Sequence, residues 1–207
     1  MPEEKLQAGH FFLNRVKPKV RPPMRLGGVV AGTRVLTPDG YRPIETLQPG
    51  DPVRALLRQA PMFVSVLWIG SRDVILSRTD RSNLPVRVRK DALADGVPRR
   101  DIWLAPDHAI YVSGQLVRCV DLVNGRSIML DERPRSPTRR YWGVVLSRHN
   151  VLLADDMAIE SLLPVSATAF SDRAGNPPDL NALFIASRQH RESVQTAKEA
   201  RNPSALV

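Results

Sequence analysis

Cysteine and histidine, the side chains best suited to nucleophilic attack and proton transfer near neutral pH, are few in this sequence and lie far apart in the chain. The sequence has one cysteine, Cys119, and four histidines, of which His108 and His149 lie between predicted strands. An imidazole in such a position can act as a general acid or base. A thiolate is a strong nucleophile, but Cys119 lies in the apolar run Leu116–Val120, which predicts a buried and inert thiol. Any catalysis therefore depends on what the fold brings next to these groups.

The same counts argue against metal and cofactor sites. A single cysteine excludes an internal disulfide and any cysteine-rich zinc or iron–sulfur site. His10 and His190 lie in the terminal segments and form no ligand pattern with the other two histidines. We expect neither a metal nor a cofactor.

Short β-type runs separated by turns must position these residues. Pro38-Asp39-Gly40 and Ser113-Gly114 have the residue types of tight turns. The run Phe63–Ile69 ends at Gly70, and residues 73–76 are predicted to return as its hairpin partner. Further strands are predicted at residues 33–36, 41–47, 53–57, 86–89, 102–104, 109–112, 115–118, 141–146 and 150–153. A spacing of about 8–12 residues between short strands predicts a compact all-β domain.

The chain before this domain is basic. Residues 1–27 contain six Lys/Arg and two Glu, and the whole chain has a formal net charge of +9. The cations that alternate with prolines are Arg15, Lys17, Lys19, Arg21 and Arg25. Prolines prevent a regular ladder of amide donors, so this arm is predicted to be extended and flexible. Two interpretations stay open, a solvated linker or a contact with an unidentified acidic partner. No specific nucleic-acid module is recognisable.

The sequence divides the chain into three segments: a basic Pro-rich arm at residues 1–27, the β domain at residues 28–165 and a tail at residues 166–207. Residues 166–178 are rich in small and polar types and predict a loop. Asp179 is placed to cap a short C-terminal helix from Asn181 to Ala200.

Composition places the chain among globular proteins. No apolar stretch reaches the roughly 18 residues of a membrane-spanning helix, and no signal peptide is visible, so we expect a cytoplasmic protein without membrane contact. Non-classical secretion stays open.

Three stretches, in this order, resemble the Hedgehog/intein (Hint) superfamily, specifically its bacterial Hint-domain proteins. The first is the segment from Ala31 to Asp51, AGTRVLTPDGYRPIETLQPGD. The second is LAPDHAI, from Leu104 to Ile110, and the third is YWGVVLSRHNVLLA, from Tyr141 to Ala154. Together they cover about residues 28–163. The resemblance implies a horseshoe-like all-β fold of short strands with pseudo-two-fold halves, and autocatalytic cleavage of the backbone.

In this family a Cys or Ser at the first position of the domain attacks the preceding carbonyl. The matching position here is Gly28, which has no side chain. The resemblance makes His108 the histidine that binds the scissile amide and protonates its nitrogen. The Thr/Ser helper three residues earlier is Ala105. His149 matches a second histidine that assists later steps.

These departures favour a degenerate domain in which His108 and His149 are vestigial. Splicing inteins also end in a His-Asn pair, and the matching positions, Glu160-Ser161, cannot form the succinimide. We therefore expect a chain that has lost self-cleavage. Two alternatives stay open: an active self-cleaving module with an unrecognised nucleophile, and a binding or structural module whose basic arm contacts an acidic partner.

Overall fold

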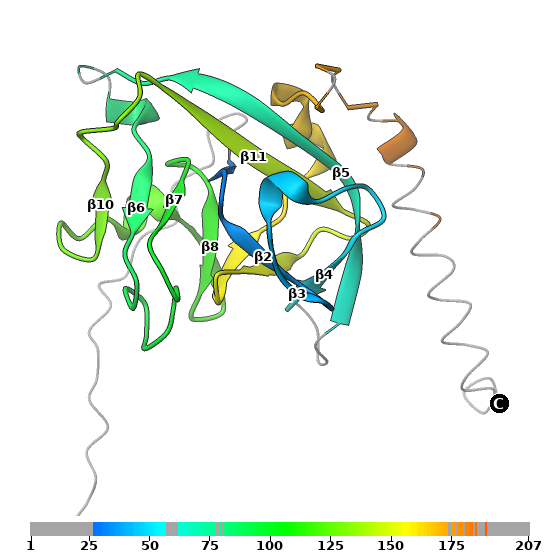
Figure 1. Ribbon diagram of the computed structural model, residues 1–207, viewed down its shortest axis with the longest axis horizontal. Coiled ribbons are helices and arrows are strands. Elements are labelled where there is room, and N and C mark those ends of the chain that lie inside the picture. The colour runs from blue at the N-terminus through cyan, green and yellow to red at the C-terminus, as the bar shows by residue number, and fades with distance from the viewer. Residues whose placement is uncertain are drawn as a thin grey trace, which may run out of the picture.

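Antiparallel strands form almost all of the regular structure in the computed structural model (Figure 1). The structure describes residues 27–56, 62–77, 79, 81–173, 175–176, 178–179, 181–183, 185 and 189. Residues 1–26 of the basic arm, with His10, and His190 lie outside this set. The strands are β1 (Val29–Val30), β2 (Arg34–Thr37), β3 (Gly40–Pro43), β4 (Pro52–Ala55), β5 (Met62–Ile75), β6 (Val86–Val88), β7 (Ile102–Leu104), β8 (Ala109–Val112), β9 (Gln115–Arg118), β10 (Ile128–Leu130), β11 (Thr138–Leu146), β12 (Val151–Ala154) and β13 (Met157–Glu160). Within these described residues, four short 3₁₀ helices accompany them: η1 (Ile44–Thr46), η2 (Arg81–Asn83), η3 (Cys119–Leu122) and η4 (Pro164–Ala169). The predicted all-β fold is confirmed.

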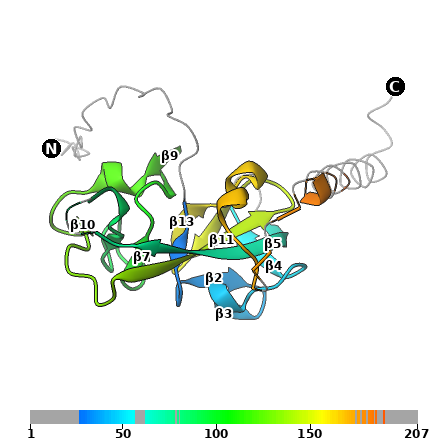
Figure 2. The same cartoon turned by 90° about the horizontal axis from the view of Figure 1, so that it is seen from above.

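The strands join into one curled sheet whose middle is β5. The order is β10-β6-β7-β1-β11-β5-β4-β12-β13-β8-β9, so five strands lie on each side of β5, while β2 and β3 branch off β12. β5 and β11 run side by side across the whole molecule (Figures 1 and 2). β1 is only two residues long, yet it lies between β7 and β11 and pairs with both. The N-terminal end of the domain is therefore built into the sheet.

The longest strand, β5, corrects one prediction. The runs Phe63–Ile69 and Asp73–Leu76 do not form a hairpin around Gly70, because β5 continues through this residue. A Cβ on Gly70 would lie 2.1 Å from Trp68 Cη2 and 2.6 Å from the carbonyl oxygen of Ser171. Glycine is needed here for close packing across the sheet, whereas sequence alone shows only a turn-forming residue type.

Two tight hairpins have two-residue turns in which both central residues have positive φ. Ser113 and Gly114, which join β8 to β9, have φ values of 50° and 82°. Asp155 and Asp156, which join β12 to β13, have φ values of 48° and 66°. Positive φ at both central residues matches the twist of a two-residue hairpin. The first turn is predicted by its sequence. The second escapes prediction because a pair of aspartates is a weaker turn signal than a glycine.

Part of the segment after β13 packs against the sheet, although the sequence predicts a loop there. Residues 166–178 are predicted to form a loop, but η4 covers part of them and Phe170 is buried. Ser171 pairs with Ser71 of β5 through two backbone hydrogen bonds of 2.9 and 2.7 Å. The Asp179 carboxylate accepts a hydrogen bond from the Ala182 N–H, as expected of an N-cap. No helix in the described part of the chain is long and apolar enough to cross a membrane.

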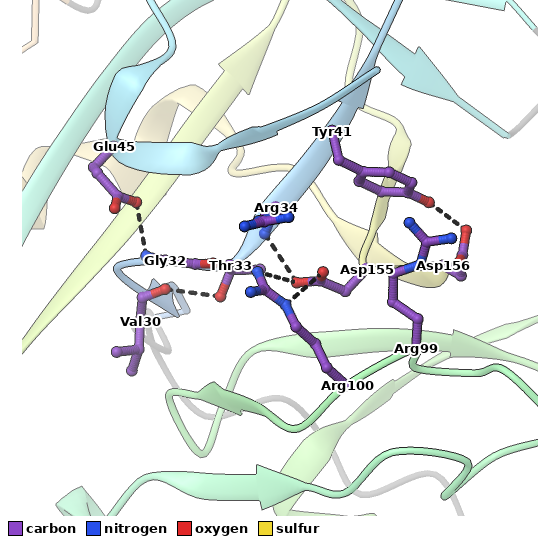
Figure 3. Close-up of polar contacts among 10 residues, drawn as sticks. All are labelled: Val30, Gly32, Thr33, Arg34, Tyr41, Glu45, Arg99, Arg100, Asp155 and Asp156. Carbon is purple, nitrogen blue, oxygen red and sulfur yellow. Dashed lines mark hydrogen bonds and ion pairs between the residues drawn. The ribbon is translucent and has the colours of Figure 1, made fainter.

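A buried carboxylate holds three segments of the domain together (Figure 3). Asp155 is fully buried and pairs with Arg100, with Nε 2.7 Å from Oδ1 and Nη2 3.1 Å from Oδ2. Its Oδ2 also accepts a 2.9 Å hydrogen bond from the backbone N–H of Arg34. Arg100 in turn donates to the carbonyl of Gly32. The start of β2, the loop before β7 and the β12–β13 turn therefore share one ionic centre.

We expect Asp155→Asn to lower the free energy of unfolding by about 3 kcal/mol, because it removes the buried charge that Arg100 and the Arg34 amide require. Asn keeps the positive φ that this turn needs. Asp156→Asn is the matched control, since Asp156 has a similar φ but its side chain is about one-third exposed and pairs with Arg99. Its loss should stay below about 1 kcal/mol in denaturant titrations. Equal losses in the two variants would contradict the central role of Asp155.

Candidate functional site

Three of the residues that the sequence singles out, Gly28, Ala105 and His108, meet at one peptide group, between Gly27 and Gly28. Both glycines are buried at the start of β1. The strand that follows pairs Val29 with Trp142 of β11 and with Leu104 of β7. The peptide is therefore inserted between two strands that lie more than thirty residues apart in the chain.

His108 binds the nitrogen side of this peptide. Its Nδ1 accepts a hydrogen bond of 2.9 Å from the Gly28 N–H. The turn between β7 and β8 fixes the histidine, because its own N–H donates to the carbonyl of Ala105 and its carbonyl accepts from Cys119, both at 2.9 Å. An Nδ1 that accepts cannot carry a proton, so the neutral ring holds its proton on Nε2. Burial lowers the pKa of His108 to about 4, which keeps the ring uncharged at neutral pH.

Two further donors bind the carbonyl oxygens of Gly27 and Gly28. The Gly28 carbonyl accepts 2.9 Å from the backbone N–H of Ala105. The Gly27 carbonyl accepts 3.3 Å from Nη2 of Arg72, on β5. Every polar atom of the Gly27–Gly28 peptide group thus has a partner, and we call this set of contacts the peptide clamp. Its members are His108, Arg72 and the Ala105 amide.

Gly28 leaves no room for a side chain. Its φ of 125° is strained for any residue with a Cβ. A Cβ at this position would lie 2.9 Å from Tyr141 Cβ, 3.2 Å from the Trp142 carbonyl oxygen and 3.4 Å from Phe170 Cζ. The position that the family resemblance assigns to the nucleophile therefore has no side chain, and the packing around it leaves no space for one.

The helper position and the cysteine offer no substitute. Ala105 is fully buried and contributes only backbone groups. The predicted burial of Cys119 is confirmed: its thiol is inaccessible and donates to the carbonyls of Ala105 and Pro106 at 3.0 and 3.3 Å. Burial, with a smaller contribution from Asp107, raises the pKa of the Cys119 thiol, so little thiolate forms.

His149 lies at the other end of the third sequence block. Its Nε2 is 3.0 Å from Oε1 of Glu160, and both side chains are partly buried. The neighbouring Ser161 is buried and its Oγ accepts a 3.0 Å hydrogen bond from the Asn150 N–H. The described contacts thus tie His149 to the end of β13. A role for it at the Gly27–Gly28 peptide stays a prediction.

Sequence reasoning missed the residues that close the site. Arg72 lies where the sequence predicts a turn, and Phe170 lies in the predicted loop. Leu162 also contributes, since a Cβ on Gly27 would lie 3.6 Å from its Cδ2. The one available signal was Phe170 itself, a large aromatic residue in a segment of small and polar types. No group of three or more potential metal ligands occurs among the residues that the structure describes.

Comparison with known proteins identifies a family. A family model described as a Hint domain matches residues 28–166. Solved structures similar to this chain include a bacterial intein-like domain from Clostridium thermocellum, at 18% identity and a TM-score of 0.49, covering 65% of this chain and 98% of that one. A DnaB intein from Synechocystis sp. PCC 6803 matches at 12% identity and a TM-score of 0.46, covering 66% of this chain and 99% of that one. The gp41-1 intein matches at 14% identity and a TM-score of 0.45, covering 64% and 97%. The comparison with curated proteins found no match.

The buried His108 makes stability depend on pH in a defined direction. Its pKa falls from 6.5 to about 4 on folding, so the neutral ring's contribution is fully present above pH 6.5 and is lost as the pH drops toward 4. We expect this group alone to remove up to roughly 3 kcal/mol of unfolding free energy over that range.

His108→Asn tests this, because Asn can accept from Gly28 and does not titrate. Denaturant titrations between pH 7 and pH 4.5 should show a steeper fall for the native chain than for the variant. Parallel pH profiles would refute the assignment of a neutral His108.

Proposed function

This chain belongs to the Hint-domain family of the self-processing superfamily, and we propose that it binds the peptide at its own cleavage position without cutting it. The observation that carries the proposal is Gly28, which has no nucleophile and no space for one. An N–S or N–O acyl shift needs a side-chain atom on this residue to attack the Gly27 carbonyl. Without that atom the covalent pathway is lost, not merely slowed.

The protonation state of His108 supports the same conclusion. A general acid for the departing nitrogen needs a proton on the atom that faces it. In this domain Nδ1 faces the Gly28 nitrogen and already accepts its hydrogen. With a pKa of about 4, the ring acts as a neutral acceptor at physiological pH. This arrangement stabilises an intact peptide. We therefore assign His108 a binding role in this chain and regard its family role as vestigial.

The alternative of an unrecognised nucleophile has little support from the described contacts. Cys119 uses its thiol to donate to two carbonyls, and its raised pKa disfavours the thiolate. The hydroxyl of Thr33, the first hydroxyl after Gly28 in the chain, donates to the carbonyl of Val30 at 2.7 Å. Both groups serve the backbone of the fold.

We expect the native chain, with a reporter fused to its N-terminus, to stay intact during incubation with dithiothreitol or hydroxylamine. Mass spectrometry would detect a break between Gly27 and Gly28. Gly28→Cys should also stay uncleaved, and it should lose about 2–5 kcal/mol of stability from backbone strain and overlap with Tyr141.

Gly32→Cys is the matched control, because Gly32 has φ of 85° but a Cβ placed there would meet nothing within 4 Å. It isolates the backbone cost, about 1–2 kcal/mol. Thiol-dependent cleavage of the native chain at Gly27–Gly28 would overturn the proposal. Similar stability losses in the two cysteine variants would show that packing does not close the site.

A second function, binding of an acidic partner, has its support in the charge of residues 1–27. Because the clamp fixes Gly27, the basic arm is attached at a defined point of the domain. Replacing Arg15, Lys17, Lys19, Arg21 and Arg25 by Gln should lower the salt concentration at which the chain elutes from heparin.

The control replaces four exposed arginines of the domain by Gln: Arg89, Arg126, Arg133 and Arg135. Its elution should change less than that of the arm variant. If the arm variant elutes like the native chain, the arm is a solvated linker.

A further inference from the structure

Arg72 is a partly buried cation that lies between two aromatic rings. Its guanidinium carbon lies 5.3 Å from the ring centroid of Tyr141 and 5.3 Å from that of Phe170. Contacts of this kind stabilise a cation by roughly 0.5–2 kcal/mol each. The two rings come from β11 and from the segment after η4, so distant parts of the chain fix the orientation of the guanidinium.

This orientation directs the cation at one carbonyl. Nη2 of Arg72 donates to the Gly27 oxygen at 3.3 Å. The nitrogen of the same peptide group donates to Nδ1 of His108 at 2.9 Å. The peptide is thus held between a cationic donor on its oxygen and a neutral acceptor on its hydrogen. Both contacts favour the resonance form with negative oxygen and positive nitrogen, so they reinforce one another.

Packing alone does not account for this residue. Burial of the guanidinium carries a desolvation cost and lowers the pKa of Arg72. Asp107 contributes a favourable charge interaction, and the aromatic rings another. An apolar side chain of similar length would fill the space between the rings without the desolvation cost. A cation is useful here because a carbonyl needs a donor.

We propose that Arg72 is the carbonyl-binding residue of the clamp and polarises the Gly27 carbonyl. It supplies from β5 a donor that Ala105, at the family's helper position, cannot supply from a side chain. The inference rests on the proposed function, since it assigns a group to the same intact peptide. It also implies that the carbonyl half of the site is still arranged for a developing negative charge.

The sequence allows a direct test, because Gly27–Gly28 is its only Gly-Gly pair. A chain labelled with ¹³C-carbonyl and ¹⁵N glycine therefore gives one HNCO cross-peak, which reports the Gly27 carbonyl and the Gly28 amide together. Arg72→Met keeps the stem between the rings but removes the donor. We expect the Gly27 carbonyl resonance to move upfield and the Gly28 amide to exchange about tenfold faster with solvent.

Three comparisons separate this role from a general loss of packing. Arg72→Lys should recover part of the carbonyl shift, because it keeps a cationic donor. Phe170→Leu keeps Arg72 but removes one ring, and should move the resonance in the same direction as Arg72→Met. Arg140→Met, on neighbouring β11, removes an exposed arginine that pairs with Asp73 and should leave the peak unchanged.

A Gly27 carbonyl resonance that stays in place in folded Arg72→Met, or in folded Phe170→Leu if the first variant does not fold, would overturn the assignment of Arg72. This outcome is distinct from failure of the proposed function, which would appear as a cleaved chain in mass spectrometry.

Discussion

One hydrogen bond, from the Gly28 N–H to Nδ1 of His108, joins the residue before β1 to the turn between β7 and β8. It fixes the residue that precedes β1, and β1 is the strand that connects β7 to β11 in the sheet. Without β1, two strands would face each other with unpaired amides and carbonyls, which is costly in a buried position. The continuity of one half of the fold thus depends on a two-residue strand and on the peptide that leads into it.

The contact that His108 makes with this peptide also withholds a proton from the Gly28 nitrogen. A buried, neutral imidazole accepts a hydrogen well but has no proton to give at the same atom. Gly28 has a positive φ that directs its amide at His108, and Tyr141 and Phe170 occupy the space where a Cβ would lie. Stabilising the bound peptide and cleaving it are therefore opposed demands on the same few atoms.

Local patterns in the sequence were sufficient for much of this architecture. The alternation of Val86 and Val88 with arginines marks a strand whose valines are fully buried, and Ser113-Gly114 marks a hairpin by its positive φ. The likeness of LAPDHAI to a known block led to His108. Long-range packing was beyond such patterns. The sequence around Gly70 is typical of a turn, and the contact with Ser171 that requires glycine is not visible in it. The contacts of Arg72 with Tyr141 and Phe170 likewise depend on residues far away in the chain.

The insertion of β1 has a mechanical consequence. A force applied to the chain upstream of Gly27 does not unravel an exposed end, because the first described residues are already buried between two long-separated strands. The load falls on the hydrogen bonds of β1 to β7 and β11, and on those of Arg72 and His108. Release of the first residues of the domain under tension therefore requires that these contacts, contributed by β5, β7, β11 and the turn before β8, are broken.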